Sequence, residues 1–300
     1  MSRKPHPDPM YGGDAEPAGF DQAAVAVLPV PYEATVSYGG GTASGPQAIL
    51  KASAQVELYD EWLEVEPWRA GVWTEPALAL PQGDSEAVMD TIASRFGALM
   101  DAGRWVVMLG GEHSITPGGV RAAAERHPGL RVLQLDAHAD LRRSYQGDAN
   151  SHACAAARCL ELAPVNAVGI RSCSAEEASR IRAGIPGYQM VHAWEMTGDE
   201  NTWIDRALDG LAGAPVYLTI DLDYFDPGIL PATGTPEPGG GQWWPTLNLL
   251  RTLFLRADVV AADVVELAPV PGLHHADFLA ARLVSRLIAL KFRDRLAALP

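Results

Sequence analysis

Short apolar runs alternate along this chain with longer segments of helical periodicity, and this alternation constrains the fold more than any other feature. Strands that are buried on both faces are apolar throughout, so the pattern is typical of a parallel sheet covered by helices. Seven runs rich in Val, Leu and Ile are predicted to be strands: Ala23–Pro29, Trp105–Leu109, Arg131–Leu135, Ala167–Ile170, Gln189–His192, Pro215–Leu222 and Val259–Val265. The sequence therefore predicts an α/β protein.

The segments between these runs are predicted to be helices. Asp84–Ala102 is the clearest, because apolar residues recur there every four positions. The other predicted helices are Pro117–His127, Ala153–Leu162, Ala175–Ala183, Glu200–Leu211, Pro245–Leu255 and Asp277–Leu296. We find no internal repeat and no linker in mid-chain, so residues 23–300 are expected to form one domain. The start of the chain is rich in Pro, Gly and charge, so residues 1–22 are expected to form a flexible N-terminal arm.

Composition narrows the class of protein. The 300 residues are 48% hydrophobic and carry 23 basic against 37 acidic side chains, a net charge of −14. A chain with this share of hydrophobic residues can build a large core. Its negative charge disfavours binding to nucleic acid and suits the binding of a cationic small molecule. The three cysteines (Cys154, Cys159 and Cys173) are an odd count and are interpreted as free thiols. With no apolar run for a membrane span and no signal peptide, we expect a soluble cytoplasmic protein.

Three predicted strands run directly into polar segments: GGEHS at 110–114, DAHAD at 136–140 and DLDYFDP at 221–227. In a parallel sheet, ligands bind beyond the carboxyl ends of the strands. Taken singly, each segment has an ordinary interpretation as a turn, a helix cap or a loop. Three such segments at strand ends favour a functional site.

Alternate residues of extended backbone face the same way, so Asp136, His138 and Asp140 are expected to converge. Four carboxylates that gather in one place require a cation. The candidate ligands are His113, Asp136, His138, Asp140, Asp221 and Asp223. This set of oxygen and imidazole ligands favours Mn²⁺ over zinc, with Co²⁺, Ni²⁺ or Fe²⁺ as alternatives. Six ligands suit two ions with bridging carboxylates, which can hold a hydroxide between them; this predicts a hydrolase.

The three polar segments, in this order and separation, resemble the manganese-dependent ureohydrolases, the family of arginase and agmatinase. Further agmatinase-like segments are LPVPYEATVSYGGGTASGPQAILKASAQVELYD, SHACAAARCLE, VGIRS, TGTPEPGG and ADVVELAP. The likeness extends from about residue 23 to 292. It implies a three-layer α/β/α fold with an eight-stranded parallel sheet, two Mn²⁺ per subunit and a homo-oligomer, either a trimer or a hexamer.

The resemblance also assigns ligands to the two ions. By matching position, the first ion would take His113, Asp136, Asp140 and Asp221, and the second Asp136, His138, Asp221 and Asp223. Two of these carboxylates, Asp136 and Asp221, would bridge the ions. The hydroxide held between the ions would attack the guanidinium carbon, while Asp140 accepts a hydrogen bond from it.

Two further catalytic residues follow from the resemblance. Glu266 matches the family carboxylate that pairs with the substrate guanidinium, and a carboxylate and a guanidinium form a planar match of two hydrogen bonds. His152 matches the family histidine that carries protons to the leaving amine, a task that suits a group titrating near neutrality.

The substrate is inferred from the loop before His152. Asp148 would repel a carboxylate and attract an ammonium group, whereas Asn150 has an arginase-like placement. Residues 169–174 read GIRSCS and lack the aspartates that arginase uses. We therefore expect agmatine to be hydrolysed to urea and putrescine, a step of polyamine biosynthesis. Ala232, where the family has Gly, leaves guanidinobutyrate, guanidine and arginine open. A zinc deacetylase and a non-catalytic metal-binding relative are the remaining alternatives.

Overall fold

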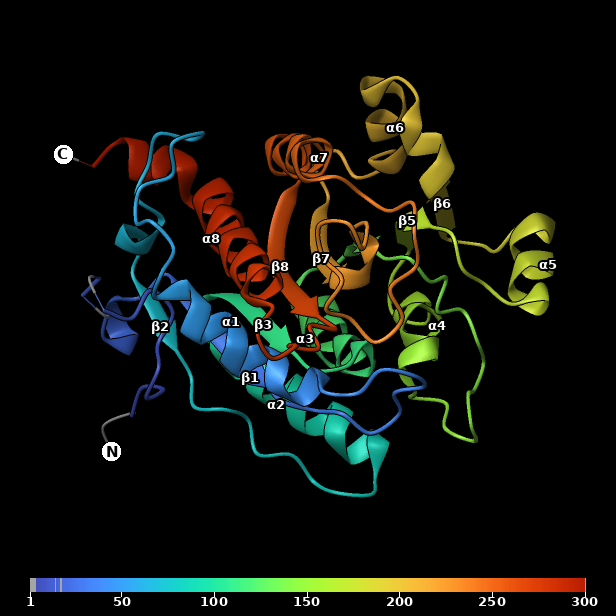
Figure 1. The fold of residues 1–300 in the computed structure, drawn as a ribbon, viewed down its shortest axis with the longest axis horizontal. Coiled ribbons are helices and arrows are strands. Elements are labelled where there is room, and N and C mark those ends of the chain that lie inside the picture. Colours follow the sequence, from blue (N-terminus) through green and yellow to red (C-terminus); the bar gives the residue numbers. More distant parts are fainter. Residues whose placement is uncertain (1–3, 14, 17, 300) are drawn as a thin grey trace.

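A fully parallel sheet of eight strands forms the centre of the computed structural model, which describes residues 4–13, 15–16 and 18–299 (Figure 1). The strands follow the order β2-β1-β3-β8-β7-β4-β5-β6. Their bounds are β1 (Val25–Val30), β2 (Val72–Thr74), β3 (Trp105–Gly110), β4 (Arg131–Leu135), β5 (Val165–Ile170), β6 (Tyr188–His192), β7 (Pro215–Asp221) and β8 (Asp258–Val265). The α/β class and the eight-stranded parallel sheet are thus confirmed.

Helices cover both faces of the sheet, which gives the expected three layers. Helices α1, α6, α7 and α8 pack on one face, and α2, α3, α4 and α5 pack on the other (Figure 1). The helices are α1 (Gly45–Ser53), α2 (Ser85–Asp101), α3 (Thr116–Arg126), α4 (Ala155–Leu160), α5 (Ala175–Ala183), α6 (Glu200–Ala207), α7 (Trp243–Arg256) and α8 (His274–Ala297). Short 3-10 helices include η4 (His113–Ile115), η5 (His152–Cys154) and η7 (Leu222–Tyr224). The others are η1 (Phe20–Gln22), η2 (Thr42–Ser44), η3 (Pro67–Ala70) and η6 (Ala193–Thr197).

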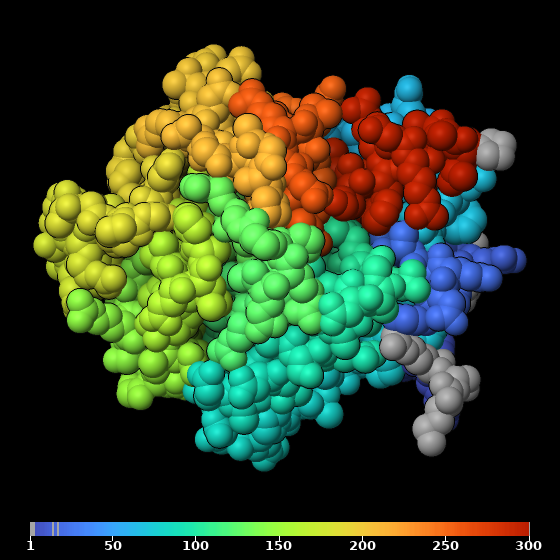
Figure 2. Space-filling view, turned by 180° about the vertical axis from the view of Figure 1, so that it is seen from behind, coloured from blue at the N-terminus to red at the C-terminus, as the bar shows by residue number. Residues whose placement is uncertain are grey.

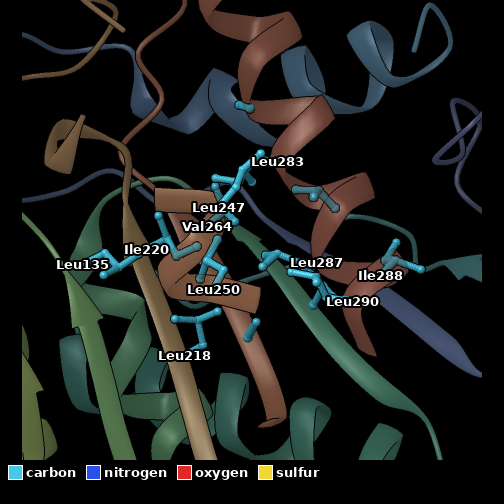
Figure 3. Packing of buried hydrophobic residues seen from close by; sticks show 14 of the residues in the cluster. Leu135, Leu218, Ile220, Leu247, Leu250, Val264, Leu283, Leu287, Ile288 and Leu290 are labelled. Carbon is cyan, nitrogen blue, oxygen red and sulfur yellow. The ribbon is translucent and has the colours of Figure 1, made fainter. Parts of the chain in front are cut away.

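The core follows from the alternation of side chains along buried strands. In β1, Val25 and Val27 pack into the layer of α1 and α8, while Leu28 packs into the layer of α2 and α3. Figure 3 shows aliphatic side chains of α7 and α8, among them Leu250 and Leu287, gathered against the central strands. Each such burial contributes about 1.5–3 kcal/mol, so the central strands form a rigid base for the loops at their ends.

One strand and one α-helix were not predicted from the sequence. Strand β2 has three residues and lies at the edge of the sheet, so it is too short for a periodic pattern. Helix α1 begins with Gly45-Pro46, a pair that resembles a loop, although proline is well accommodated in the first turn of a helix. The predicted helix Glu200–Leu211 ends four residues early, at Ala207.

The N-terminal segment differs from the flexible arm that its composition indicates. The backbone N–H of His6 donates to the carbonyl of Thr74 at 3.0 Å, which attaches the segment to β2. Tyr11 is 2% exposed, and its hydroxyl donates to Ser285 Oγ in α8 at 3.0 Å. Residues 1–3, 14 and 17 of the expected arm lie outside the described residues. The N-terminal segment and the C-terminal end of α8 lie at the end of the molecule opposite α5 (Figure 2).

Replacing Tyr11 with alanine is expected to lower the free energy of unfolding by about 3–5 kcal/mol, because a buried aromatic ring and its hydrogen bond are lost. Tyr38, which is 87% exposed, provides the matched control, and its replacement is expected to change stability by less than about 0.5 kcal/mol. Urea denaturation measures both values. If replacing Tyr11 changes the free energy of unfolding as little as replacing Tyr38 does, the contact of Tyr11 with α8 contributes nothing to stability.

Candidate metal centre

The centre of the sheet brings the predicted site segments together. Strands β3, β8, β7 and β4 are consecutive neighbours, and each of them ends near one of the polar segments. The chain leaves β3 and returns as β4 on the far side of β8 and β7, so the order of the strands switches here. Connections that diverge at such a switch leave a crevice beyond the carboxyl ends of the strands.

Three carboxylates surround one imidazole nitrogen. His113 Nδ1 lies 3.1 Å from Asp136 Oδ2, 3.2 Å from Asp140 Oδ2 and 3.2 Å from Asp221 Oδ2. Ligand atoms of His113, Asp136 and Asp140 lie within 4.8 Å of one another and can hold a metal ion. Each of these four side chains is buried, and they come from the ends of three different strands.

A second group of ligands adjoins the first. His138 Nδ1 lies 2.9 Å from Asp223 Oδ2 and 3.7 Å from Asp136 Oδ1. These three residues also meet the spacing that a metal ion requires. Asp136 belongs to both groups, with one oxygen turned to each histidine. The structure thus gathers the six predicted ligands at one place.

Backbone geometry explains how a short segment presents so many carboxylates. Asp136 Oδ1 accepts the N–H of His138 at 2.6 Å, and Asp221 Oδ1 accepts the N–H of Asp223 at 2.9 Å. These local bonds hold both segments in turns. Asp140 has φ +49°, so the chain bends there instead of continuing extended as predicted. The bend turns the Asp140 carboxylate back toward His113.

The electrostatics of the site show excess negative charge. Burial and the Asp136 carboxylate raise the pKa of Asp140 to about 7. Burial works against the charged form of His138, but Asp223 outweighs it and raises the imidazole pKa to about 11. Burial and Asp223 likewise raise the pKa of Asp221. Within the described residues, no Lys or Arg pairs with the four clustered aspartates, so metal cations are the natural counter-charge.

His113 gives a direct test of whether the residues fit a metal. Its buried Nδ1 faces the three carboxylates and has no hydrogen-bond partner among the described residues. Its other ring nitrogen, Nε2, lies 3.0 Å from Thr219 Oγ1. Metal-binding imidazoles are typically oriented in this way, with one nitrogen free for the ion and the other held by a neighbour. The donor set therefore fits divalent ions that prefer oxygen and imidazole.

A pocket of about 220 Å³ opens over the two ligand groups. It is lined by seven of the predicted site residues, His113, His138, Asp140, His152, Asp221, Asp223 and Glu266, and also by Tyr38, Arg142, Tyr145 and Glu177. Glu266 is 8% exposed, and burial raises its pKa to about 8. Burial also lowers the pKa of His152, so a neutral imidazole is favoured there.

The loop residues Asp148 and Asn150 lie elsewhere. Asp148 Oδ1 accepts the hydroxyl of Ser85 at 3.0 Å and the N–H of Asn150 at 2.8 Å. The Asn150 side chain donates to Ser85 Oγ and to Glu86 Oε2, each at 3.2 Å. Both side chains are thus held at the start of α2, and neither is among the pocket-lining residues in the described chain. The prediction that Asp148 contacts the substrate rested on its charge, and the sequence did not reveal these hydrogen-bond partners.

Other polar residues of the site were not predicted from the sequence. Gln134 donates to Asp136 Oδ2 at 2.7 Å, and Thr35 contacts His152. Asp263 accepts the hydroxyls of Thr116 at 2.9 Å and Tyr217 at 2.8 Å. No local motif marks Thr35 or Asp263, since their partners come from distant parts of the chain, and Gln134, two residues before Asp136, was passed over as part of an apolar strand.

The fold and this site define an α/β enzyme with clustered metal ligands at its strand ends. Residues 23–289 match the Arginase family, and the chain belongs to that family. It is an enzyme of the agmatinase-like ureohydrolase type, which confirms the resemblance.

The similar proteins cover most of the chain. It is 41% identical over 277 residues to N(1)-aminopropylagmatine ureohydrolase of Synechocystis sp., covering 90% of this chain and 89% of that protein. It is 33% identical over 258 residues to agmatinase of Bacillus anthracis, with 84% and 86% covered. The agmatine ureohydrolase structure of Thermoplasma volcanium aligns with a TM-score of 0.85 and 29% identity, covering 100% of this chain and 98% of that one.

No helix in the described part of the chain combines the length and the apolar character that crossing a membrane requires.

Proposed function

We propose that this protein is a binuclear metal hydrolase that cleaves the guanidino group of agmatine to urea and putrescine. The observation that carries the proposal is the position of Asp136, which contributes to two ligand groups at the base of one pocket. The same pocket is lined by Glu266 and His152. This reaction needs metal ligands, a carboxylate that binds the guanidinium and a group that carries a proton.

The proposed ligands of the first ion are His113, Asp136, Asp140 and Asp221, and those of the second are Asp136, His138, Asp221 and Asp223. Two Mn²⁺ are the proposed occupants, because the donors are oxygens and imidazoles without a thiolate. When bound, such a pair supplies Lewis acidity and a water whose proton is lost near neutral pH.

Three residues perform the remaining tasks. Glu266 binds and orients the guanidinium, since a carboxylate matches two of its N–H groups. Asp140 accepts a hydrogen bond from the attacking nucleophile and fixes its direction. His152 moves a proton to the leaving amine, and the lowered pKa favours its neutral form before it takes up that proton.

Agmatine suits the charge of the pocket. Bound ions would neutralise Asp140, Asp221 and Asp223, which leaves Glu177 and Glu266 as the acidic lining residues that act on the substrate, with Arg142 as the one Lys or Arg of the lining in the described residues. Agmatine has a guanidinium and an ammonium group, whereas arginine adds a carboxylate that these acidic groups repel. A homo-oligomer, a trimer or a hexamer, and a cytoplasmic location belong to the same proposal.

A second candidate substrate is N(1)-aminopropylagmatine. The relative at 41% identity carries that substrate in its name. This molecule adds a three-carbon amine arm to agmatine, so the chemistry at the guanidinium is unchanged and the difference lies in how the tail is bound.

A urea-release assay across several guanidino compounds tests the proposal. The protein is loaded with Mn²⁺ and given agmatine, N(1)-aminopropylagmatine, arginine, guanidinobutyrate or guanidine. We expect agmatine to have a kcat/KM at least about 100-fold above that of arginine, because burying an unmatched charged group is costly. A higher kcat/KM for N(1)-aminopropylagmatine would move the assignment to the second candidate. Absence of urea from every compound would overturn the proposed function.

A further inference from the structure

Glu112 lies next to the ligand His113 in the chain, yet its carboxylate is engaged by other groups. It is fully buried and accepts four hydrogen bonds. Its Oε2 accepts the backbone N–H groups of Ala34 and Thr35, each at 2.7 Å. Its Oε1 accepts the hydroxyls of Thr35 at 2.8 Å and Ser114 at 2.6 Å. The carboxylate therefore fixes the hydroxyl of Thr35 as a donor.

A hydroxyl has one hydrogen and two lone pairs, so Thr35 Oγ1 has only acceptor capacity left once its hydrogen points at Glu112. Two nitrogens of His152 use this capacity. The backbone N–H of His152 donates to Thr35 Oγ1 at 3.0 Å, and the ring Nδ1 lies 3.0 Å from the same oxygen. The second contact is a hydrogen bond only if Nδ1 carries the hydrogen.

The other ring nitrogen is then the reactive one. His152 lines the pocket, and the ring of Tyr145 meets it edge to face, with centroids 5.7 Å apart at 82°. With the hydrogen on Nδ1, the lone pair of a neutral imidazole is on Nε2. A proton taken up at Nε2 and passed from Nε2 to the leaving amine returns the ring to the same tautomer, and Nδ1–H donates to Thr35 throughout.

We propose that Glu112 and Thr35 are positioning residues that hold His152 in the Nδ1–H tautomer, so that Nε2 exchanges the proton during catalysis. This inference rests on the proposed function, in which His152 carries a proton to the leaving amine. Thr35 lies 117 residues from His152 in the sequence, and the fold alone brings the two together.

A purely structural role is the competing explanation. The same bonds attach residues 34 and 35 to the segment after β3, and such an attachment stabilises the fold whatever the chemistry. The two roles differ in how they couple to His152. A positioning residue has nothing left to position when the imidazole is absent, whereas a structural defect persists.

A double-mutant cycle with agmatine as substrate separates the two roles. Thr35→Val removes the hydroxyl and keeps the shape, and it is expected to lower kcat by about 10–100-fold, part of the 10²–10⁴-fold that a positioned acid–base group contributes. KM and the manganese content should stay within about twofold. Thr35→Ser keeps the hydroxyl and is expected to restore most of the rate. His152→Asn is expected to lose the full contribution of the acid–base group to kcat. The double variant, Thr35→Val with His152→Asn, should then be no slower than His152→Asn alone.

The outcomes that would overturn the inference are distinct. If Thr35→Val slows the His152→Asn enzyme by the same factor as it slows the wild type, the role of Thr35 is structural and the proposed function stands. If His152→Asn keeps the wild-type kcat, the proton-carrying role fails and the inference fails with it. Should Thr35→Val not fold, Glu112→Gln takes its place in the cycle. This variant weakens the carboxylate that accepts the Thr35 hydroxyl and so disturbs the same contact with His152.

Discussion

Replacing Asp136 with asparagine is expected to reduce urea release by at least about 1,000-fold while leaving the fold intact. Asp136 has one oxygen near His113 and the other near His138, so its loss weakens both ligand groups at once. Without the ions, the pKa of the attacking water would return from near neutrality to its far higher value in bulk water, which removes most of the nucleophile at neutral pH. Initial rates with agmatine measure the loss.

Stability should respond in the opposite direction from activity. Asp136 is one of four clustered carboxylates, and removing one negative charge relieves repulsion in the metal-free protein. The unfolding temperature of metal-free Asp136→Asn is therefore expected to equal or exceed that of the wild type. Mn²⁺ should raise the unfolding temperature of the wild type but not that of the variant, because ions stabilise only a state that binds them.

Asp226, in the polar segment that also holds Asp221 and Asp223, provides the matched control. Its carboxylate accepts the N–H groups of Gly228 and Gly239, each at 2.8 Å, and it is absent from both ligand groups in the described chain. Asp226→Asn should keep the stabilisation by Mn²⁺ and the release of urea. An Asp136→Asn enzyme that remains active, or one that unfolds with or without Mn²⁺, would contradict the account.

Replacing Glu266 with glutamine is expected to lower kcat/KM for agmatine by about 100–1,000-fold with the metal content unchanged. Removing one partner of a buried charge pair costs about 2–5 kcal/mol. Glutamine keeps the size of the side chain and an oxygen for the N–H of His113, which donates to Glu266 Oε1 at 2.6 Å. The loss therefore reports the guanidinium interaction and not a collapse of the pocket.

Glu177 is the matched control for Glu266, because it is also a buried glutamate that lines the pocket. Its oxygens are occupied by the N–H groups of Leu141 at 2.9 Å and Ser174 at 2.8 Å, the second within the cap of α5. Glu177→Gln is expected to change kcat/KM by less than about fivefold. A similar loss in both variants would show that Glu266 has no special interaction with the guanidinium.

The sequence predicted those parts of the site that depend on local geometry. Asp136 and His138 follow a strand at alternate positions, and Asp221 and Asp223 repeat that spacing at the end of a neighbouring strand. Parallel strands present their carboxyl ends at one edge, so the meeting of these four residues follows from the strand prediction. The edge strand β2 escaped prediction because three residues carry no periodic signal.

Longer-range contacts could not be predicted in this way. Thr35 reaches His152, and Thr219 of β7 reaches His113 beyond the end of β3, with β8 between the two strands, through side-chain bonds that no spacing encodes. Asp148 illustrates the opposite error. Its charge indicated a contact with the substrate, but a carboxylate bonds to the donors around it, and here those are the hydroxyl of Ser85 and the N–H of Asn150. Asp140 reaches the cluster through a positive φ angle that the extended-chain argument did not anticipate.

Counting the metal ions bound by the wild-type protein and by Asp136→Asn shows whether Asp136 joins two metal sites. Each protein is loaded with Mn²⁺, freed of unbound ion by gel filtration and measured by elemental mass spectrometry against the protein concentration. We expect two ions per wild-type chain and a clear loss of ions in Asp136→Asn. A wild-type protein that binds no ion or a single one, or a variant that keeps both, would contradict the claim that Asp136 joins two metal sites.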